Sequence, residues 1–245
     1  MSFRFKQFYI EDSKCAMKVG TDGVLLGCWA PIDRFTDRTQ NTEHRPNYTI
    51  LDIGTGSGLI ARMLMQRCPE AEVEGIDIDE AAVEQACENG IKAYCSSLQE
   101  WGISRQYSAV GIQPYDLIVS NPPYFQNSLK NPDKGRQTAR HTDTLSYEEL
   151  VRHSARLLKE GGQLALILPA EAETEIRQLA AQHSLYCTRV TRVYSKETKP
   201  ARRVLMAFER TQNTEHRAQT DSLVLENEKG GRSAAYQELA KDFYL

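Results

Sequence analysis

The chain lacks the features that mark membrane-spanning, disulfide-linked and zinc-binding proteins. No window approaches the run of roughly 20 apolar residues that a membrane helix needs, and the N-terminal stretch MSFRFKQFYIEDSKC has no uninterrupted apolar segment. The six cysteines, at positions 15, 28, 68, 87, 95 and 187, form no C-x-x-C pair. We therefore expect a cytoplasmic protein with reduced thiols, no metal ion and no membrane partner.

The sequence also lacks a strong excess of either charge. Thirty Lys and Arg residues stand against 33 Asp and Glu residues, which leaves a formal net charge of −3. This balance argues against indiscriminate binding to polyanions, although a local basic face can coexist with an acidic remainder. A length of 245 residues with 40% hydrophobic residues is typical of one domain with an ordinary core.

What the chain does contain is a regular alternation of apolar runs and helical patterns. The expected strands are 48–54, 71–79, 91–97, 115–121, 163–169, 186–194 and 203–209, and the expected helices are 57–68, 80–90, 145–162 and 171–184. Such alternation predicts an α/β fold with a mainly parallel, seven-stranded sheet. The last two strands have no helix between them, so we expect them to pair antiparallel through SKETKPA at one edge.

Helix boundaries carry their own signals. Ser146 followed by Glu149 three residues later predicts a capped helix start, and Gly161 and Gly162 predict the end of the same helix. Gly90 is expected to stop the helix before it.

Two segments lie outside the alternation. Residues 3–30 are aromatic and apolar, and residues 220–245 read as a strand, a turn and a helix. Both are too short to be independent domains, so we expect them to pack on the main sheet. The expected organisation is one domain, 1–245, with an extension at 1–48, a core at 49–210 and an addition at 211–245. The polar string RTQNTEHR occurs at 38–45 and 210–217 and is typical of a tolerated loop insertion.

A glycine-rich loop follows the first strand of the alternation. LDIGTGSGLIARML contains Asp52, Gly54, Gly56 and Gly58, and it leads directly into a helix. It is no P-loop, because no Lys-Ser/Thr pair follows, and its G-x-G-x-G spacing departs from the dinucleotide fingerprint. A pyrophosphate would be badly placed beside Asp52, whereas a sulfonium and an amino group tolerate a nearby carboxylate.

An acidic residue ends the second strand about 20 residues later. Asp77 is in position to accept hydrogen bonds from both ribose hydroxyls of a nucleoside cofactor. The alternative is that Asp77 caps the following helix, a role for which Asp79 competes.

The fourth strand ends in an unusual sequence, VSNPPYFQNS. Two consecutive prolines cannot continue a ladder or a helix, so the strand stops in a stiff loop that ends in an aromatic residue. Taken alone, Asn121-Pro122-Pro123-Tyr124 is equally well read as a strand-terminating turn.

In this order, DIGTGSG, the acidic strand end and NPPY resemble the class I S-adenosylmethionine methyltransferases that methylate amines. The resemblance implies a doubly wound, Rossmann-like sheet whose last strand is antiparallel. It implies S-adenosylmethionine as cofactor and S-adenosylhomocysteine as product. It also implies that the Asn121 side chain and the Pro122 carbonyl grip an exocyclic amine, that Pro123 stiffens the loop, and that Tyr124 stacks on a base.

The sequences at the two ends of the chain narrow the resemblance to one group within that family. FKQFYIEDSKCAMKVGTDGVLLGCWA and SAAYQELAKDFYL are similar to the bacterial adenine-N6 methyltransferases of valine tRNA, whose target is the adenine beside the anticodon. By that similarity Lys18, Thr21 and Asp22 cap the methionine end of the cofactor, although an ordinary turn before a helix explains them too. A glutamine-amide protein methyltransferase and a guanine-N2 RNA methyltransferase remain open as alternatives.

One cofactor position departs from the family. Where an Asp normally contacts the cofactor adenine, this chain has Ser97 and Leu98, and a serine bonds that amino group more weakly than a carboxylate. Basic residues are candidates for tRNA phosphate contacts. The first group follows the NPPY motif and comprises Lys130, Lys134, Arg136 and Arg140, then Arg152, Arg156 and Lys159. A second group is Lys196, Lys199, Arg202 and Arg203.

Overall fold

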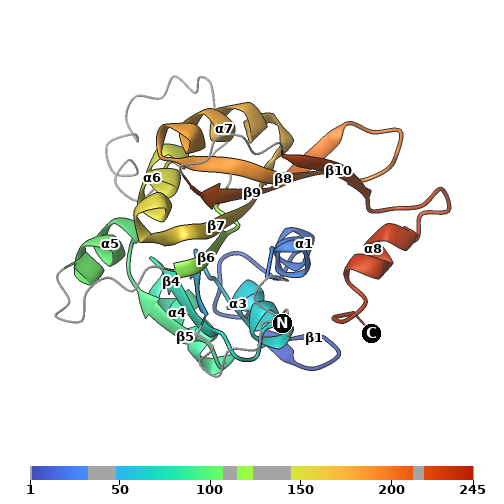
Figure 1. Cartoon of the computed structure of the whole chain (residues 1–245). Helices are drawn as coiled ribbons and strands as arrows, with labels where there is room; N and C mark the ends of the chain where they lie inside the picture. The colour runs from blue at the N-terminus through green and yellow to red at the C-terminus, as the bar shows by residue number, and fades with distance from the viewer. Residues whose placement is uncertain (1, 33–47, 107–114, 124–144, 212–217, 245) are drawn as a thin grey trace, which may run out of the picture.

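The computed structural model describes residues 2–32, 48–106, 115–123, 145–211 and 218–244 (Figure 1). Within these ranges no helix has both the length and the apolar character needed to span a membrane. Both copies of RTQNTEHR lie outside the described residues, except for Arg210 and Thr211.

The centre of the fold is one eight-stranded sheet in the order β10-β8-β9-β7-β6-β3-β4-β5. Its strands are β3 (Thr49–Ile53), β4 (Glu72–Asp77), β5 (Lys92–Cys95), β6 (Tyr115–Ser120), β7 (Leu158–Pro169), β8 (Leu185–Tyr194), β9 (Ala201–Arg210) and β10 (Gln219–Val224). Neighbouring strands are parallel except β9, which runs antiparallel to both β7 and β8. The antiparallel last strand of the core is therefore confirmed. The sheet gains an eighth strand because β10 pairs parallel with β8 and forms the edge.

Helices cover both faces of this sheet, as a doubly wound fold requires (Figure 1). Ile50 packs in one hydrophobic cluster and its neighbour Leu51 in the other, since successive strand residues point to opposite faces. The first cluster includes residues of α1 (Thr21–Trp29), α3 (Leu59–Arg67), α4 (Glu80–Glu88) and α8 (Ala234–Leu239). The second includes residues of α5 (Leu98–Gln106), α6 (Tyr147–Leu157) and α7 (Glu173–Gln182).

Two helix boundaries confirm the sequence signals and one corrects them. Ser146 and Glu149 form a reciprocal capping box at the start of α6. Gly90 follows the end of α4 with φ +84°, the left-handed conformation typical of a helix stop. The expected end of α6 at Gly161 was wrong. The helix ends at Leu157, and residues 158–162 belong to β7, where the register with β6 shifts and Gly161 has φ +74°.

Helix α5 was not expected from the sequence. Apolar periodicity does not indicate where this helix begins. Its start is marked by Ser97 and Glu100, which exchange hydrogen bonds at the S-x-x-E spacing of a capping box.

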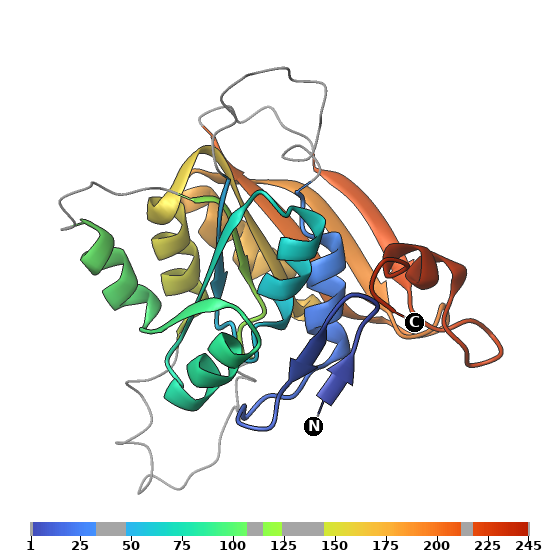
Figure 2. The same ribbon diagram turned by 90° about the horizontal axis from the view of Figure 1, so that it is seen from below.

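Both terminal segments pack on the main body, as expected. Strands β1 (Ser2–Arg4) and β2 (Tyr9–Glu11) form a small antiparallel sheet that lies near α1 in Figure 2. Phe5 and Phe8 stack with ring centroids 4.7 Å apart, and both join Phe243 in the first hydrophobic cluster. The Lys6 N–H also donates to the Phe243 carbonyl oxygen at 2.9 Å, which fastens the two ends together.

Glycines on α1 allow it to lie directly against α3. A Cβ placed on Gly27 would stand 2.5 Å from the Met63 sulfur, and one on Gly23 would stand 3.1 Å from a Leu59 methyl carbon. The contacts follow the same direction along both helices, from Gly23–Leu59 to Gly27–Met63. Helices α1 and α3 are therefore parallel, and their N-termini lie side by side. The start of α1 is thereby placed beside the loop that precedes α3 (Figure 2).

Candidate functional site

The three sequence motifs meet at one edge of the sheet. Ile53, the last residue of β3, is paired with Ile76 of β4 on one side and with Ser120 of β6 on the other. All three strands are parallel, so the segments that follow them leave the sheet at the same carboxyl edge. Gly54, Asp77 and Asn121 therefore lie on three adjacent strand ends. In open α/β sheets this edge is where ligands bind.

The first two glycines of the loop present bare backbone to open space. Gly54 and Gly56 have φ of +70° and +55°, and no atom lies within 4 Å of a Cβ built on either residue. The Gly54 and Thr55 N–H groups both donate to the Ile76 carbonyl oxygen, at 2.8 and 3.0 Å. The loop is thus held from β4, and its exposed side can accept a close ligand.

The third glycine has a different role. A Cβ on Gly58 would stand 2.5 Å from an Ile91 side-chain carbon, so this position serves packing. Gly75 of β4 is similar, because a Cβ there would stand 2.8 Å from the Thr55 hydroxyl oxygen. Gly75 therefore makes room for the loop to fold over β4.

Asp52 supports the loop from beneath. Its side chain is fully buried, and Oδ2 accepts hydrogen bonds from the Thr55 hydroxyl at 2.8 Å and the Ala61 N–H at 3.2 Å. Oδ1 has no hydrogen-bond partner. Burial raises the pKa of Asp52 to about 7, against the lowering effect of those hydrogen bonds. Asp52 is thus a group that carries only part of its negative charge at neutral pH.

Asp77 stands at the end of β4 and braces the same loop. Its Oδ2 accepts from the Gly56 N–H at 2.9 Å and its Oδ1 from the Asp79 N–H at 3.0 Å. The helix cap is Asp79, whose side chain accepts from the Ala81 N–H at 3.0 Å. Asp79, and not Asp77, therefore caps the helix. The half-buried Asp77 carboxylate keeps lone pairs that can accept hydrogen bonds from a ligand.

The third strand end places Ser97 and Leu98 beside Asp77. The Ser96 N–H donates to the Asp77 carbonyl oxygen at 2.9 Å. The Ser97 hydroxyl donates to Glu100 Oε2 at 3.0 Å and accepts from the Glu100 N–H at 3.2 Å. Leu98 is buried in the second hydrophobic cluster. The Ser97 hydroxyl is therefore engaged as a helix cap, and the Leu98 side chain is part of the core.

The NPPY motif begins immediately after β6. The Ser120 hydroxyl donates to the Ile53 carbonyl oxygen at 2.9 Å and ties this strand end to the base of the glycine loop. Asn121 is half-buried, Pro122 is buried and Pro123 is exposed. Tyr124, Lys130, Lys134, Arg136 and Arg140 lie outside the described residues.

The N-terminal candidates lie at the start of α1. The Lys18 ammonium donates to the carbonyl oxygens of Asp12, Ser13 and Cys15, at 2.7, 3.2 and 2.9 Å, so it closes the turn before the helix. Thr21 is exposed and begins α1. Asp22 is in the first helical turn, where it accepts from Arg203 Nε at 2.8 Å, and the N-cap residue is Gly20.

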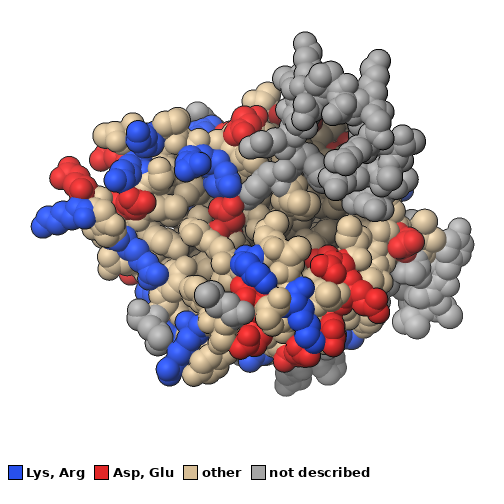
Figure 3. Space-filling model, turned by 180° about the vertical axis from the view of Figure 1, so that it is seen from behind, with Lys and Arg blue, Asp and Glu red and all other residues tan. Residues whose placement is uncertain are grey.

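The second basic group projects from the same carboxyl edge. Strand β8 ends at Tyr194 and β9 begins at Ala201, so the hairpin between them extends beyond the ends of β6 and β7. Lys196, Lys199 and Arg202 are exposed there. On the described part of the face seen in Figure 3, Lys and Arg side chains alternate with Asp and Glu side chains.

These features fit a cationic nucleoside ligand. Gly54 and Gly56 form a cradle that any side chain would fill, the half-buried Asp77 carboxylate accepts hydroxyl hydrogens, and Asp52 supplies a buried acidic group with an unpartnered oxygen. Two acidic side chains, Asp52 and Asp77, stand at this edge, and a negative charge on either would disfavour an anionic phosphate.

Comparison with known proteins agrees with this geometry. The model of the methyltransferase small domain matches residues 35–192. The chain belongs to this methyltransferase family. The match spans both the glycine loop and the NPPY motif.

Curated relatives extend the similarity over nearly the whole chain. A Parabacteroides distasonis protein named tRNA1(Val) (adenine(37)-N6)-methyltransferase is 44% identical over 99% of this chain and 97% of its own length. A Bacteroides fragilis protein of the same name is 41% identical with the same coverage. Among solved structures, a predicted O-methyltransferase from Agrobacterium tumefaciens has a TM-score of 0.65 at 17% identity, covering 90% of this chain and 96% of that one. That likeness supports the fold alone.

Proposed function

We propose that this protein transfers a methyl group from S-adenosylmethionine to the exocyclic N6 amine of an adenine in tRNA. The proposed target is adenine 37 of a valine tRNA, the position given in the names of relatives that match over nearly their whole length. The family resemblance implies that this adenine lies beside the anticodon. The observation that carries the proposal is the meeting of the glycine loop, Asp77 and Asn121 on adjacent strand ends.

The glycine-loop edge would hold the cofactor, which when bound supplies a methyl group on a sulfonium sulfur. The exposed backbone of Gly54 and Gly56 would lie against it. The Asp77 carboxylate would accept the ribose hydroxyl hydrogens, and Asp52 would provide a favourable acidic group beneath the loop. Ser97 and Leu98 would border the adenine, with the Ser97 hydroxyl already engaged as a cap.

The N-terminal segment would close the same site from α1. Because Gly23 packs on Leu59, the start of α1 lies beside the loop that opens α3. Thr21 and Asp22 would then face the methionine end of the cofactor. Lys18 would act through the turn that it closes with three carbonyl oxygens.

Asn121 and Pro122 would hold the target amine. The lone pair of an exocyclic amine is delocalised into its ring, which makes the nitrogen a poor nucleophile. Two acceptors, the Asn121 side-chain oxygen and the Pro122 carbonyl oxygen, would bind its two hydrogens and aim the lone pair at the methyl carbon. The product ammonium is acidic and releases its proton afterwards, so the chain needs no general base. Pro123 would fix the loop geometry, and Tyr124 would stack on the base, worth about 1–3 kcal/mol.

Basic side chains would hold the tRNA backbone. Lys130, Lys134, Arg136 and Arg140 follow the NPPY motif in the sequence, and Lys196, Lys199 and Arg202 lie on the β8–β9 hairpin at the same sheet edge. Phosphate contacts of this kind give affinity and salt dependence without sequence specificity.

We further propose that residues 1–245 act as one methyltransferase domain, with an extension at 1–48, a core at 49–210 and an addition at 211–245. The shared cluster of Phe5, Phe8 and Phe243 against α3 supports this organisation.

A methyl-transfer assay with two competing acceptors tests the function. Tritiated S-adenosylmethionine is supplied with purified protein and either total tRNA or total protein from a bacterial strain that lacks the endogenous activity. The proposal predicts label in tRNA that nuclease releases. Label that resists nuclease and is released by protease would instead favour the glutamine-amide alternative.

A further inference from the structure

One side chain connects three separate parts of the fold at the glycine loop. The Asn89 amide nitrogen donates to the carbonyl oxygen of Ser57 at 2.8 Å and to that of Glu11 at 2.8 Å. Its amide oxygen accepts from the Glu11 N–H at 3.0 Å. Ser57 lies between Gly56 and Gly58 in the loop, whereas Glu11 ends β2 of the N-terminal segment. Asn89 therefore joins α4, the glycine loop and the N-terminal segment.

The orientation of Asn89 is set by the end of α4. Its own N–H donates to the Gln85 carbonyl oxygen at 3.0 Å, and Gly90 then takes the left-handed conformation that lets the Ile91 N–H return to the Ala86 carbonyl oxygen at 2.9 Å. A helix end fastened in this way fixes the Asn89 backbone, from which the side chain reaches Ser57 and Glu11.

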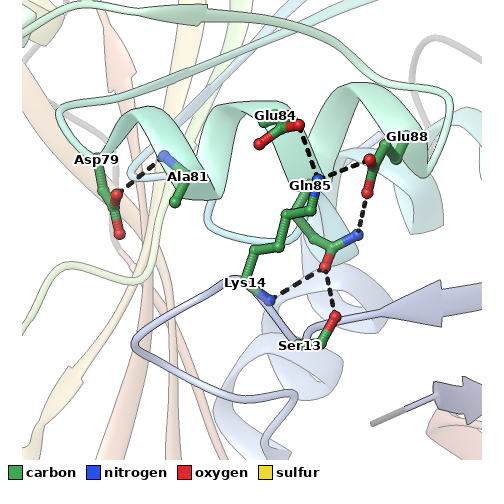
Figure 4. Close-up of polar contacts among 7 residues, drawn as sticks. All are labelled: Ser13, Lys14, Asp79, Ala81, Glu84, Gln85 and Glu88. Carbon is green, nitrogen blue, oxygen red and sulfur yellow. Dashed lines mark hydrogen bonds and ion pairs between the residues drawn. The ribbon is translucent and has the colours of Figure 1, made fainter.

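A second amide, one helical turn earlier, strengthens the same junction (Figure 4). Gln85 is buried, and its side-chain oxygen accepts from the Ser13 hydroxyl and the Lys14 N–H, both at 3.2 Å. The Lys14 ammonium contacts Glu84 at 2.8 Å and Glu88 at 2.7 Å. Ser13 and Lys14 are thus held to α4 by these contacts, whereas Asn89 holds Glu11 and reaches the glycine loop at Ser57.

We propose that Asn89 is a positioning residue for cofactor binding, which it serves without touching the cofactor. By holding the Ser57 carbonyl oxygen it fixes the backbone between the two loop glycines, and by holding Glu11 it sets the N-terminal segment that leads to Thr21 and Asp22. The inference rests on the proposed use of this loop and segment as the cofactor site.

The substitution Asn89→Asp is a sharp probe of this role. A carboxylate has nearly the same shape and still accepts from the Glu11 N–H. It cannot donate to the carbonyl oxygens of Ser57 and Glu11, and its negative charge repels them. Isothermal titration with S-adenosylhomocysteine, in the absence of tRNA, measures the effect. Losing these bonds is expected to raise the Kd about tenfold. The KM for S-adenosylmethionine should rise by a similar factor, while kcat at saturating substrates stays within about twofold.

Asn227→Asp is the matched control. Asn227 also donates through its amide, to the Arg232 carbonyl oxygen at 3.1 Å, and accepts from the Lys229 and Gly231 N–H groups, but it lies in the turn after β10. It should leave the Kd for S-adenosylhomocysteine unchanged. A Kd for Asn89→Asp equal to that of the wild type or of this control would overturn the proposal and reduce Asn89 to a fold-stabilising residue.

Hydrogen exchange on the wild-type protein gives a second test that needs no variant. S-adenosylhomocysteine should slow exchange both in the peptide around residues 54–61 and in the peptide around residues 9–14. Protection of the first peptide alone would contradict the connection through Asn89. Both measurements use the cofactor product without tRNA. A failure to methylate tRNA would therefore overturn the proposed substrate, whereas the role of Asn89 would still be decided by these two measurements.

Discussion

The Ser120 hydroxyl donates to the Ile53 carbonyl oxygen across 2.9 Å, at the level where β6 and β3 end. Asn121 follows one of these residues and Gly54 follows the other. The bond therefore joins the strand end that would hold the target amine to the strand end that would hold the cofactor. Both residues are buried, so the bond is shielded from water.

Removing this hydroxyl should destabilise the fold. Ser120→Ala leaves a buried carbonyl oxygen without this partner, and the free energy of unfolding should fall by about 1–3 kcal/mol. Urea denaturation measures the loss. Ser222→Ala, on the exposed side of β10, is the control and should change stability by less than about 0.5 kcal/mol. Equal stability of the two variants would mean that the Ser120 bond contributes little.

In the proposed reaction, Asn121 is the residue on which the amine chemistry would depend most. Asn121→Ala removes an acceptor that would grip the amine during attack, and kcat should fall by about 10²–10³-fold. Titration with S-adenosylhomocysteine should give an affinity close to that of the wild type. Asn227→Ala, in a remote turn, should retain full turnover. If Asn121→Ala kept more than about a third of wild-type kcat, the amine site would lie elsewhere.

Asp77 should govern cofactor affinity and not turnover. Asp77→Asn keeps the shape of the side chain but removes its charge. Asp77 now accepts from the Gly56 and Asp79 N–H groups, and in the variant one of these would face an NH2 group that cannot accept. The Kd for S-adenosylhomocysteine should rise by about 10–100-fold, since charge-assisted bonds are roughly twice as strong as neutral ones. Asp79→Asn, at the adjacent helix cap, should change it by no more than about twofold. A large fall in kcat at saturating cofactor would assign Asp77 to catalysis instead.

The buried Asp52 should leave a signature in the pH dependence of stability. Its pKa rises from an ordinary 3.8 to about 7 in the folded protein because of burial. The folded state therefore binds the proton more tightly than the unfolded state. The resulting stability is fully present below about pH 4, declines as the pH rises and is lost above about pH 7.

The comparison with Asp52→Asn isolates this effect. The wild-type free energy of unfolding minus that of the variant should fall by roughly 3–4 kcal/mol between about pH 4 and pH 7 and then level off. Urea denaturation at a series of pH values provides the curve. A difference that stays constant with pH, or that grows as the pH rises, would show that the folded protein does not favour the neutral acid.

Most of the sheet could be predicted from the sequence because apolar runs and helical periods alternate strongly from β3 to β9. The eighth strand could not be placed, since the pairing of β10 with β8 depends on contacts between segments far apart in the chain. Helix α5 was missed because its first turn is set by the Ser97–Glu100 cap and not by apolar spacing. The end of α6 was misplaced because Leu158 pairs with Tyr115 and begins β7 before the glycines.

The meeting of the candidate site residues at one sheet edge was predictable to a similar extent. The motifs identify Gly54, Asp77 and Asn121, and parallel strand topology brings such residues to one edge. Sequence reasoning missed Ser120 and Asn89, because nothing local distinguishes a serine at a strand end or an asparagine before Gly90 from residues without such contacts. Their partners, Ile53 and Glu11 with Ser57, are brought near only by the folded chain.

In the proposed reaction, the joined strand ends methylate an adenine amine in tRNA. Its most direct test is mass spectrometry of nucleosides and of nuclease fragments from valine tRNA treated with the purified protein and S-adenosylmethionine. The expected product is N6-methyladenosine in the fragment that carries the adenine beside the anticodon, formed at least about 10²-fold more slowly with Asn121→Ala. A methyl group found on guanine or cytosine, or no methylated nucleoside at all, would contradict it.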